Sequence, residues 1–221
     1  MTRPHEDLER HTPTDHRPGG APVTFAPGTW CAIDVVHVKA DRVNAGVSAY
    51  ETLIEKARTS AVKAHGAAIL RSANNRRVIA LIGINGHDAF RHLKTTWDDH
   101  HLSAERHAVA ESSALALYQV AASGGQATID PASHDSYAFE HVARDPSQVR
   151  ALIAATGAAE GFRGLLVFGT DDARASVVVY RFVHAGQLDA FRQSAPAQQI
   201  LGPIGDMGET TSPVHPVKTF G

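Results

Sequence analysis

A histidine-rich stretch, HDAFRHLKTTWDDHH, runs from His87 to His101 and carries the residue types most able to do chemistry. On a helix with about 100° per residue, an apolar stripe that includes Trp97 would face inward. Four histidines lie on the flanks of this stripe or to one side of it: His92, His100, His101 and His107. The spacing therefore predicts a helix that presents one indole and several imidazoles to the space between itself and a sheet.

Such a helix face could form a pocket for an aromatic substrate. A tryptophan offers a flat apolar wall, and a neutral imidazole can take a phenolic proton near pH 7 because its ordinary pKa is about 6.5. We predict His92, His100 and His101 as candidate catalytic bases, and Trp97 and His107 as substrate contacts. Alternatively, these histidines are ordinary residues at the edge of the core, and the charged residues form a solvated face.

Polar residues on the predicted strands could complete this pocket. Asp34 lies within an apolar strand, where it could orient a catalytic histidine or simply face solvent. Arg181 could hold a phenolate or a substrate carboxylate, or could instead pair with a carboxylate of the protein. His37 and Tyr180 are further candidates for substrate contact, although tyrosines such as Tyr180 and Tyr50 are more often core residues than catalytic ones.

The spacing of the ligand-type residues argues against a metal site. His100 and His107 share a helix face but lie about 10 Å apart along the axis, too far for one zinc ion. His101 has no histidine at i+4, and the sequence contains no HExxH motif. Cys31 is the single cysteine, which excludes an internal disulfide and a CxxC motif. We predict no metal ligands.

The elements that must position these residues follow a regular order in the first half of the chain. Periodicity and turn residues predict four strands, at Trp30–Lys39, Ala67–Ser72, Arg77–Ile84 and Ala114–Ala121. They predict two helices, at Val43–Val62 and His87–Ser112. The resulting order, β-α-β-β-α-β, is that of the ferredoxin-like unit.

The same order restarts after a linker rich in Gly, Ser and Asp at residues 123–136. The predicted strands are Tyr137–Ala143, Gly164–Gly169, Ala175–Val183 and Thr210–Phe220, and the predicted helices are Pro146–Ala159 and Gln187–Met207. The tetrapeptide Asp88–Arg91 returns as Asp189–Arg192, which we interpret as the same place in each copy, the start of its second helix.

Two ferredoxin-like repeats, 28–122 and 137–221, therefore predict an α+β fold. Each sheet carries helices on one face only, so the two uncovered faces can stack into an α+β barrel within one chain. We predict that the first repeat is the active half, because the second helix of the second repeat has neither Trp nor His.

The β-α-β-β-α-β repeat with the segment RVIALIGINGHDAFRHLKTTWDDHH resembles the dimeric α+β barrel superfamily, and within it the antibiotic-biosynthesis monooxygenases. The resemblance covers about residues 30–220. It implies an oxygenase that tailors an aromatic polyketide by phenol or anthrone oxidation, or by oxidative ring opening. It implies O2 with no tightly bound cofactor, or with reduced flavin (FMNH2 or FADH2) as a co-substrate from a flavin reductase.

The resemblance is incomplete at one position and leaves other functions open. The small anthrone oxygenases have an Asn four residues before their pocket Trp, where this chain has Leu93. Other members of the superfamily suggest a polyketide cyclase or aromatase, which would use the same histidines without O2, or a haem-binding barrel. A non-catalytic small-molecule binder is a further alternative.

Composition limits the partners. With a formal net charge of −2 and no basic stripe, the chain is a poor candidate for nucleic-acid binding. It has no run of 18 apolar residues, so we expect no membrane span. Residues 1–27 are rich in Pro, His and charge, and we expect a disordered arm rather than a signal peptide. We expect a cytoplasmic protein, pseudo-dimeric within one chain and compatible with a homodimer.

Overall fold

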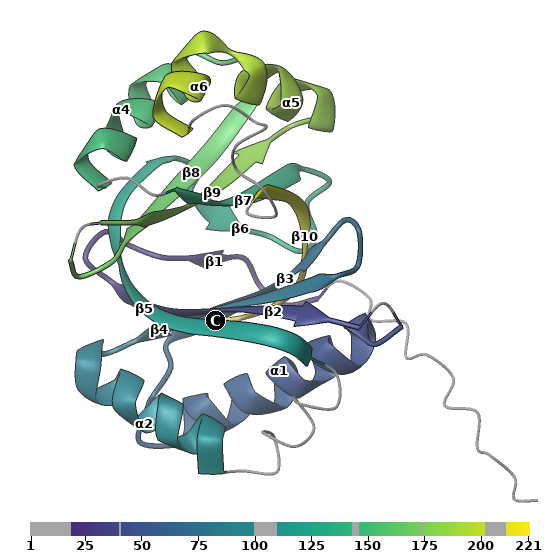
Figure 1. Cartoon of the computed structure of the whole chain (residues 1–221), viewed down its shortest axis with the longest axis vertical. Helices are drawn as coiled ribbons and strands as arrows, with labels where there is room; N and C mark the ends of the chain where they lie inside the picture. Colours follow the sequence, from purple (N-terminus) through teal and green to yellow (C-terminus); the bar gives the residue numbers. More distant parts are fainter. Residues whose placement is uncertain (1–18, 40, 100–109, 143–145, 173, 202–210) are drawn as a thin grey trace, which may run out of the picture.

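A computed structural model of the chain shows two layers of strands enclosed between two layers of helices (Figure 1). The residues that it describes are 19–39, 41–99, 110–142, 146–172, 174–201 and 211–221. Within these ranges, no helix combines the length and the apolar character needed to cross a membrane.

Each half of the chain forms one β-α-β-β-α-β unit, which confirms the predicted fold class. Repeat 1 comprises β2 (Trp30–Val38), α1 (Val43–Thr59), β3 (Gly66–Ser72), β4 (Arg77–Ile84), α2 (Gly86–Asp99) and β5 (Ala110–Gly125). Repeat 2 comprises β7 (Ser136–Val142), α4 (Pro146–Gly157), β8 (Phe162–Gly169), β9 (Ser176–Phe182), α5 (Ala185–Gln193), α6 (Ala195–Leu201) and β10 (Thr211–Phe220). Two short strands, β1 (Val23–Thr24) and β6 (Thr128–Ile129), pair with each other.

The eight long strands close into one antiparallel barrel in the order β10-β3-β4-β2-β5-β8-β9-β7. The last strand of each repeat crosses to the other repeat, where β5 pairs with β8 and β10 pairs with β3. These two pairings join the sheets and leave no unpaired edge in the barrel. The barrel therefore forms within a single chain.

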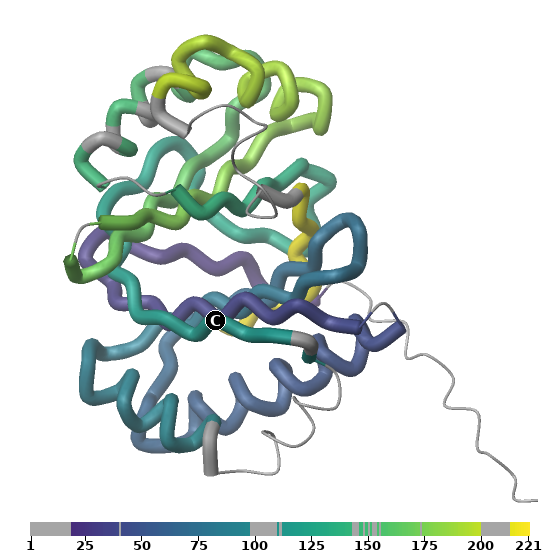
Figure 2. Tube along the Cα trace, in the orientation of Figure 1, coloured from purple at the N-terminus to yellow at the C-terminus, as the bar shows by residue number. Residues whose placement is uncertain are grey.

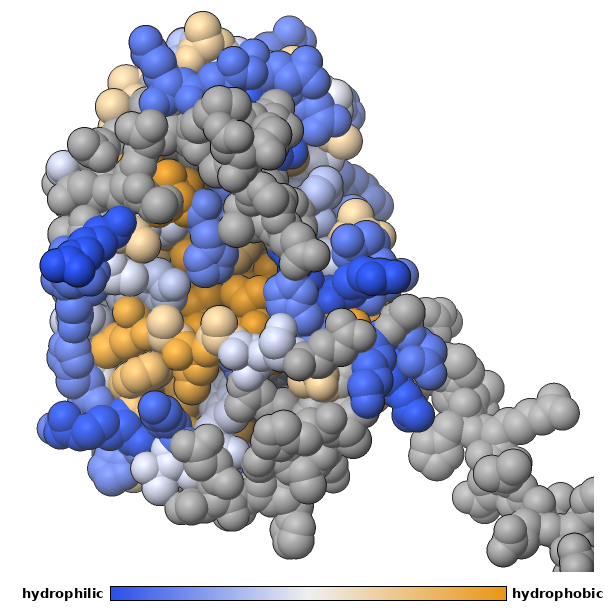
Figure 3. Space-filling view, viewed as in Figure 1, coloured by the Kyte–Doolittle hydropathy of each residue, from blue (hydrophilic) through white to orange (hydrophobic). Residues whose placement is uncertain are grey.

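Side chains alternate between the two faces of each sheet along its strands, and this explains how both faces are buried. On β2, Ala32 and Val36 pack against helices α1 and α2, whereas Ile33 and Val35 point into the barrel. A third apolar cluster lies between the sheet of repeat 2 and helices α4, α5 and α6. The trace in Figure 2 shows one helical layer outside each sheet, and apolar surface is visible between the two strand layers in Figure 3.

The N-terminal segment was predicted to be disordered through residue 27, and this prediction is wrong from Gly19 onward. The backbone at Gly19 bridges Lys218, and Val23 pairs with Ile129. Val23 and Phe25 join the apolar cluster inside the barrel. Phe25 is 2% exposed, and its ring centroid lies 6.1 Å from that of Phe168 in an edge-on arrangement. This segment is therefore part of the barrel core.

Three other boundaries differ from the prediction. Residues 123–125 of the predicted linker belong to β5, and residues 128–129 form β6. The predicted helix His87–Ser112 extends too far, since residues 110–112 are strand. The predicted helix Gln187–Met207 is divided into α5 and α6 at Ser194, whose backbone is extended. Pro196 then lies in the first turn of α6, where proline is tolerated.

Burial of Phe25 predicts that the N-terminal segment contributes to stability. We expect Phe25→Ala to lower the free energy of unfolding by about 3 kcal/mol, because it leaves a cavity in a packed core. The matched control is Thr24→Ala in the neighbouring, exposed position, which should cost less than about 1 kcal/mol. Urea unfolding of the full chain measures both, and equal effects would contradict the buried position of Phe25.

Candidate functional site

Three residues of repeat 1 meet between its sheet and its helices: Asp34 from β2, Tyr50 from α1 and Trp97 from α2. The Tyr50 hydroxyl donates a hydrogen bond to Asp34 Oδ2 over 2.7 Å. The ring centroids of Tyr50 and Trp97 lie 5.8 Å apart, with the planes tilted by 57°. The exposed fractions of Asp34, Tyr50 and Trp97 are 0%, 5% and 2%. We call these residues the Asp34–Tyr50–Trp97 cluster.

The local sequence explains why the cluster forms. Asp34 has the same strand parity as Ala32 and Val36, so its side chain points to the helices. Tyr50 belongs to the buried stripe of α1, and Trp97 lies four residues after the buried Leu93 on α2. Two amphipathic helices thus bring two aromatic rings over one carboxylate.

The cluster combines a proton acceptor with aromatic walls. A buried carboxylate is costly unless it accepts hydrogen bonds, and Tyr50 supplies one to Asp34. A hydroxyl oxygen has two lone pairs, so a tyrosine can donate to a carboxylate and also accept from another group. Faces of indole and phenol suit a planar aromatic ring. The arrangement is therefore suited to a phenolic ligand.

Repeat 2 buries a carboxylate at the corresponding position. Glu140 on β7 pairs with Val178 on β9, as Asp34 pairs with Ala80 in repeat 1. Glu140 is fully buried, and Arg192 Nε lies 2.8 Å from its Oε1 atom. Burial raises the pKa of Glu140, and the nearby Arg192 guanidinium opposes this effect. This carboxylate is therefore held in an ion pair with an arginine.

Tyr180 lies beside Glu140 and not in the Asp34–Tyr50–Trp97 cluster. It is fully buried, and its ring centroid lies 5.7 Å from that of Phe191. Burial, and then the charge of Glu140, raise the pKa of Tyr180 well above its ordinary value. Tyr180 therefore belongs to the helix–sheet core of repeat 2, which is the commoner of the two roles considered for this tyrosine.

The repeated tetrapeptide does not occupy equivalent helix positions. Asp88–Arg91 fills the third to sixth positions of α2, whereas Asp189–Arg192 fills the fifth to eighth positions of α5. Arg91 is exposed and pairs with Asp88, while Arg192 turns inward to Glu140. The two copies of the tetrapeptide were interpreted as the same position in each repeat. This interpretation is wrong, because the second copy lies two residues further from the start of its helix than the first copy does.

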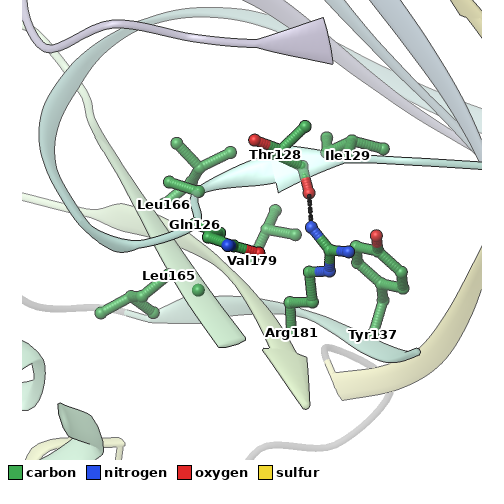
Figure 4. A pocket seen from close by; sticks show the side chains of 10 residues that line it. Gln126, Thr128, Ile129, Tyr137, Leu165, Leu166, Val179 and Arg181 are labelled. Atoms are coloured by element: carbon green, nitrogen blue, oxygen red, sulfur yellow. Dashed lines mark hydrogen bonds between the residues drawn. The ribbon is translucent and has the colours of Figure 1, made fainter. Parts of the chain in front are cut away.

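Arg181 lies inside the barrel and not beside Trp97. Its Nε atom pairs with the carboxylate of Asp135, and its Nη1 atom donates to the Thr128 carbonyl over 3.2 Å (Figure 4). The guanidinium also lies 5.8 Å from the centroid of the Tyr137 ring. The adjoining cavity has a volume of only about 10 Å³, room for about one water molecule. Arg181 thus pairs with a carboxylate of the protein, which is the second of the two roles predicted for it.

The predicted histidines have different outcomes. His92 is exposed on α2, and half-buried His37 has the strand parity of Ile33 and Val35, which point into the barrel. Neither belongs to the Asp34–Tyr50–Trp97 cluster among the described residues, and their roles in catalysis or substrate contact stay predictions. His100, His101 and His107 lie outside the described residues and stay predictions.

The structure brings the predicted residues Asp34 and Trp97 together with Tyr50, which was not predicted as a site residue. The prediction offered a histidine or solvent as the neighbour of Asp34, whereas the structure shows a buried carboxylate bound by a tyrosine.

Among the described residues, no three His, Cys, Asp or Glu side chains are grouped as metal ligands. Cys31 is buried in the barrel, and burial raises the pKa of its thiol.

His141 is a titratable group with a shifted pKa in the described part of the barrel. It is half-buried on β7, and its ring centroid lies 5.3 Å from that of Phe139. Burial lowers the pKa of His141, and the positive charge of Arg77 lowers it further. The folded protein thus favours the neutral imidazole.

This shift predicts a loss of stability at acidic pH. The unfolded chain takes up the His141 proton at a higher pH than the folded chain, so unfolding is favoured as the pH falls below about 6.5. In urea unfolding between pH 7 and 5, we expect a smaller loss of stability for His141→Asn than for the wild type. Parallel stability curves for the two proteins would contradict this prediction.

Comparison with known proteins finds similarity only at the level of structure. No family model matches the chain, and no curated protein matches it. An anthrone oxidase-like protein superposes with a TM-score of 0.68 at 13% identity, over 90% of this chain and 96% of that one. A candidate monooxygenase from Fusobacterium nucleatum superposes with a TM-score of 0.60 at 12% identity, over 88% of this chain and 95% of that one.

A candidate monooxygenase from Lactobacillus acidophilus gives a TM-score of 0.53 at 6% identity, over 87% of this chain and 95% of that one. At such low identities, the superpositions report on the fold alone. They confirm the fold that the resemblance implied. The chain therefore shares its ferredoxin-like barrel fold with these three proteins.

Proposed function

We propose that the protein is an oxygenase that oxidises a phenolic aromatic substrate bound in repeat 1, between its sheet and helices α1 and α2. The observation that carries this proposal is the buried hydrogen bond from Tyr50 to Asp34 beside the indole of Trp97. It joins a proton acceptor and an aromatic surface in one place, as oxidation of a phenol requires.

The chemistry begins with loss of the phenolic proton. A phenolate is far richer in electrons than the phenol, and it can transfer one electron to O2 to give a radical pair. Recombination of that pair forms the new carbon–oxygen bond, and a site that excludes water protects the pair until then. The proton acceptor is one of the groups near Trp97, either the Asp34–Tyr50 pair or the predicted bases His100 and His101.

The finer identity of the substrate follows from fold likeness and chemistry together. A neighbour in fold is an anthrone oxidase-like protein, and a polycyclic phenol would match the surface offered by Tyr50 and Trp97. We propose an aromatic polyketide as the substrate class. If the phenolate alone does not reduce O2, we propose reduced flavin, supplied by a flavin reductase, as the co-substrate.

Repeat 1 is the active half in this proposal. Repeat 2 ties its corresponding carboxylate, Glu140, to Arg192 and packs Phe191 against Tyr180. Repeat 2 then serves to complete the barrel, through the pairings of β8 with β5 and of β10 with β3.

Oxygen uptake tests this function directly. We expect the protein to accelerate O2 consumption with a model anthrone or naphthol, either alone or with enzymatically reduced flavin. Trp97→Phe should lower kcat/KM at least about tenfold, a change of about 1.4 kcal/mol in transition-state stabilisation. The matched control is Trp30→Phe, because the ring of Trp30 lies against that of His87, and it should retain activity.

Other outcomes would replace the proposal. Conversion of the substrate without O2 consumption would indicate a cyclase. Tight binding with unchanged recovery would indicate a small-molecule binder. A Soret absorption band in the purified protein would indicate a haem protein. Equal losses in Trp97→Phe and Trp30→Phe would contradict the proposed position of the pocket.

A further inference from the structure

The hydrogen bond between Tyr50 and Asp34 has a defined direction. An ionised carboxylate can only accept, so the Tyr50 hydroxyl is the donor to Asp34 Oδ2. The distance of 2.7 Å is typical of an O–H···O bond, and a charged acceptor strengthens such a bond. The proton of Tyr50 therefore already points at the acceptor to which it would move.

The hydrogen-bonded pair of Tyr50 and Asp34 lies in the interior of the fold. Asp34 is fully buried, and Tyr50 is 5% exposed with its ring against Trp97. The hydrogen-bonded pair is therefore enclosed between the sheet and the helices of repeat 1. A phenol placed on Trp97 would lie beside the ring of Tyr50, whose hydroxyl is bonded to Asp34.

Repeat 2 provides an internal comparison. Its buried carboxylate, Glu140, also has a tyrosine beside it, but Arg192 lies 2.8 Å from the carboxylate. In repeat 1 the arginine of the same tetrapeptide, Arg91, is exposed and pairs with Asp88. The described hydrogen-bond donor to Asp34 is a hydroxyl, a group with a transferable proton.

We propose that Tyr50 and Asp34 form a proton relay that ionises the bound substrate. The O–H bond of the substrate breaks as its proton moves to the Tyr50 oxygen. The Tyr50 O–H bond breaks as the original proton moves to Asp34 Oδ2. The products are a phenolate, a neutral Tyr50 and a protonated Asp34, and no electron is transferred in this step. The relay rests on the proposed function, since it requires a phenol beside Trp97.

The relay makes Tyr50 the catalytic residue that touches the substrate and Asp34 the final proton acceptor. Its test uses 4-nitrophenol, whose ionised form has its own visible absorption band, and requires neither O2 nor flavin. Below the pH at which free 4-nitrophenol ionises, we expect the ligand bound to the wild type to show the phenolate band. Asp34→Asn and Tyr50→Phe should bind the ligand in its neutral form.

The variants are chosen to preserve the fold. Asparagine keeps an oxygen that can accept the Tyr50 hydrogen bond, and phenylalanine keeps the ring that packs on Trp97. The matched control is Tyr180→Phe, which removes the hydroxyl beside Glu140 in repeat 2 and should keep the phenolate band. Cooperative urea unfolding of each variant verifies that it is folded.

Steady-state kinetics supply a second readout. With an oxidisable phenol, Tyr50→Phe should lower kcat at least about 100-fold at a pH below the ionisation of that phenol. Its activity should recover at a pH above that ionisation, because the substrate then arrives as the phenolate. A purely structural role of Tyr50 would lower activity equally at both pH values.

Each result separates the relay from the oxygenase function. A neutral bound ligand in the wild type, or a phenolate band that persists in Asp34→Asn, overturns the relay even if O2 is consumed. Loss of the band in His101→Ala with retention in Asp34→Asn assigns the base to His101 and likewise overturns it. A band that depends on Asp34, without O2 uptake from any phenol, supports the relay and rejects the oxygenase. Failure of the wild type to bind phenols rejects both.

Discussion

The exchange of strands between the two repeats is the interaction on which the rest of the structure depends. Because β5 pairs with β8 and β10 pairs with β3, the inner faces of both sheets are brought together. Their contact is filled by large apolar side chains, including Leu81, Phe139 and Phe168. In the described part of the barrel, the cavity beside Arg181 has a volume of only about 10 Å³, as expected for a closely packed interior.

Much of the fold could be predicted because long elements carry periodic signals. The strand Arg77–Ile84 was predicted to the residue, and Pro146, predicted near a helix start, is the first residue of α4. Asn75 has a φ of 57°, the left-handed conformation that asparagine tolerates in turns. The two-residue strands β1 and β6 could not be predicted, since Val23 and Phe25 form no periodic pattern and are buried only by distant strands.

The candidate site could be predicted only in part, and strand parity explains most of the errors. Asp34 and Trp97 were recognised because one interrupts an apolar strand and the other lies on an apolar helix stripe. Tyr180 and Arg181 are adjacent on β9, so they must face opposite sides of the sheet and cannot both line one pocket. Asp34 and His37, three residues apart on β2, are separated for the same reason.

Tyr50 could not be recognised from its own surroundings in the sequence. It lies on the buried stripe of α1 among Val47, Leu53 and Ile54, where a tyrosine normally fills core volume. What distinguishes Tyr50 is the position of its hydroxyl over Asp34, on a strand that precedes it in the chain. A polar residue on the helix-facing side of a strand, with a tyrosine on the next helix, is the pattern that would have indicated it.

The two repeats show how a small displacement along a helix can divide structural and chemical roles. A shift of two residues turns a side chain by about 200° around the helix axis. In α5 the arginine of the tetrapeptide therefore meets Glu140, whereas in α2 it meets solvent and Asp88. The arginine neutralises one buried carboxylate as a fixed part of the fold. The other carboxylate accepts the hydrogen bond of Tyr50 beside Trp97, and these two groups are the ones that we propose as a proton relay.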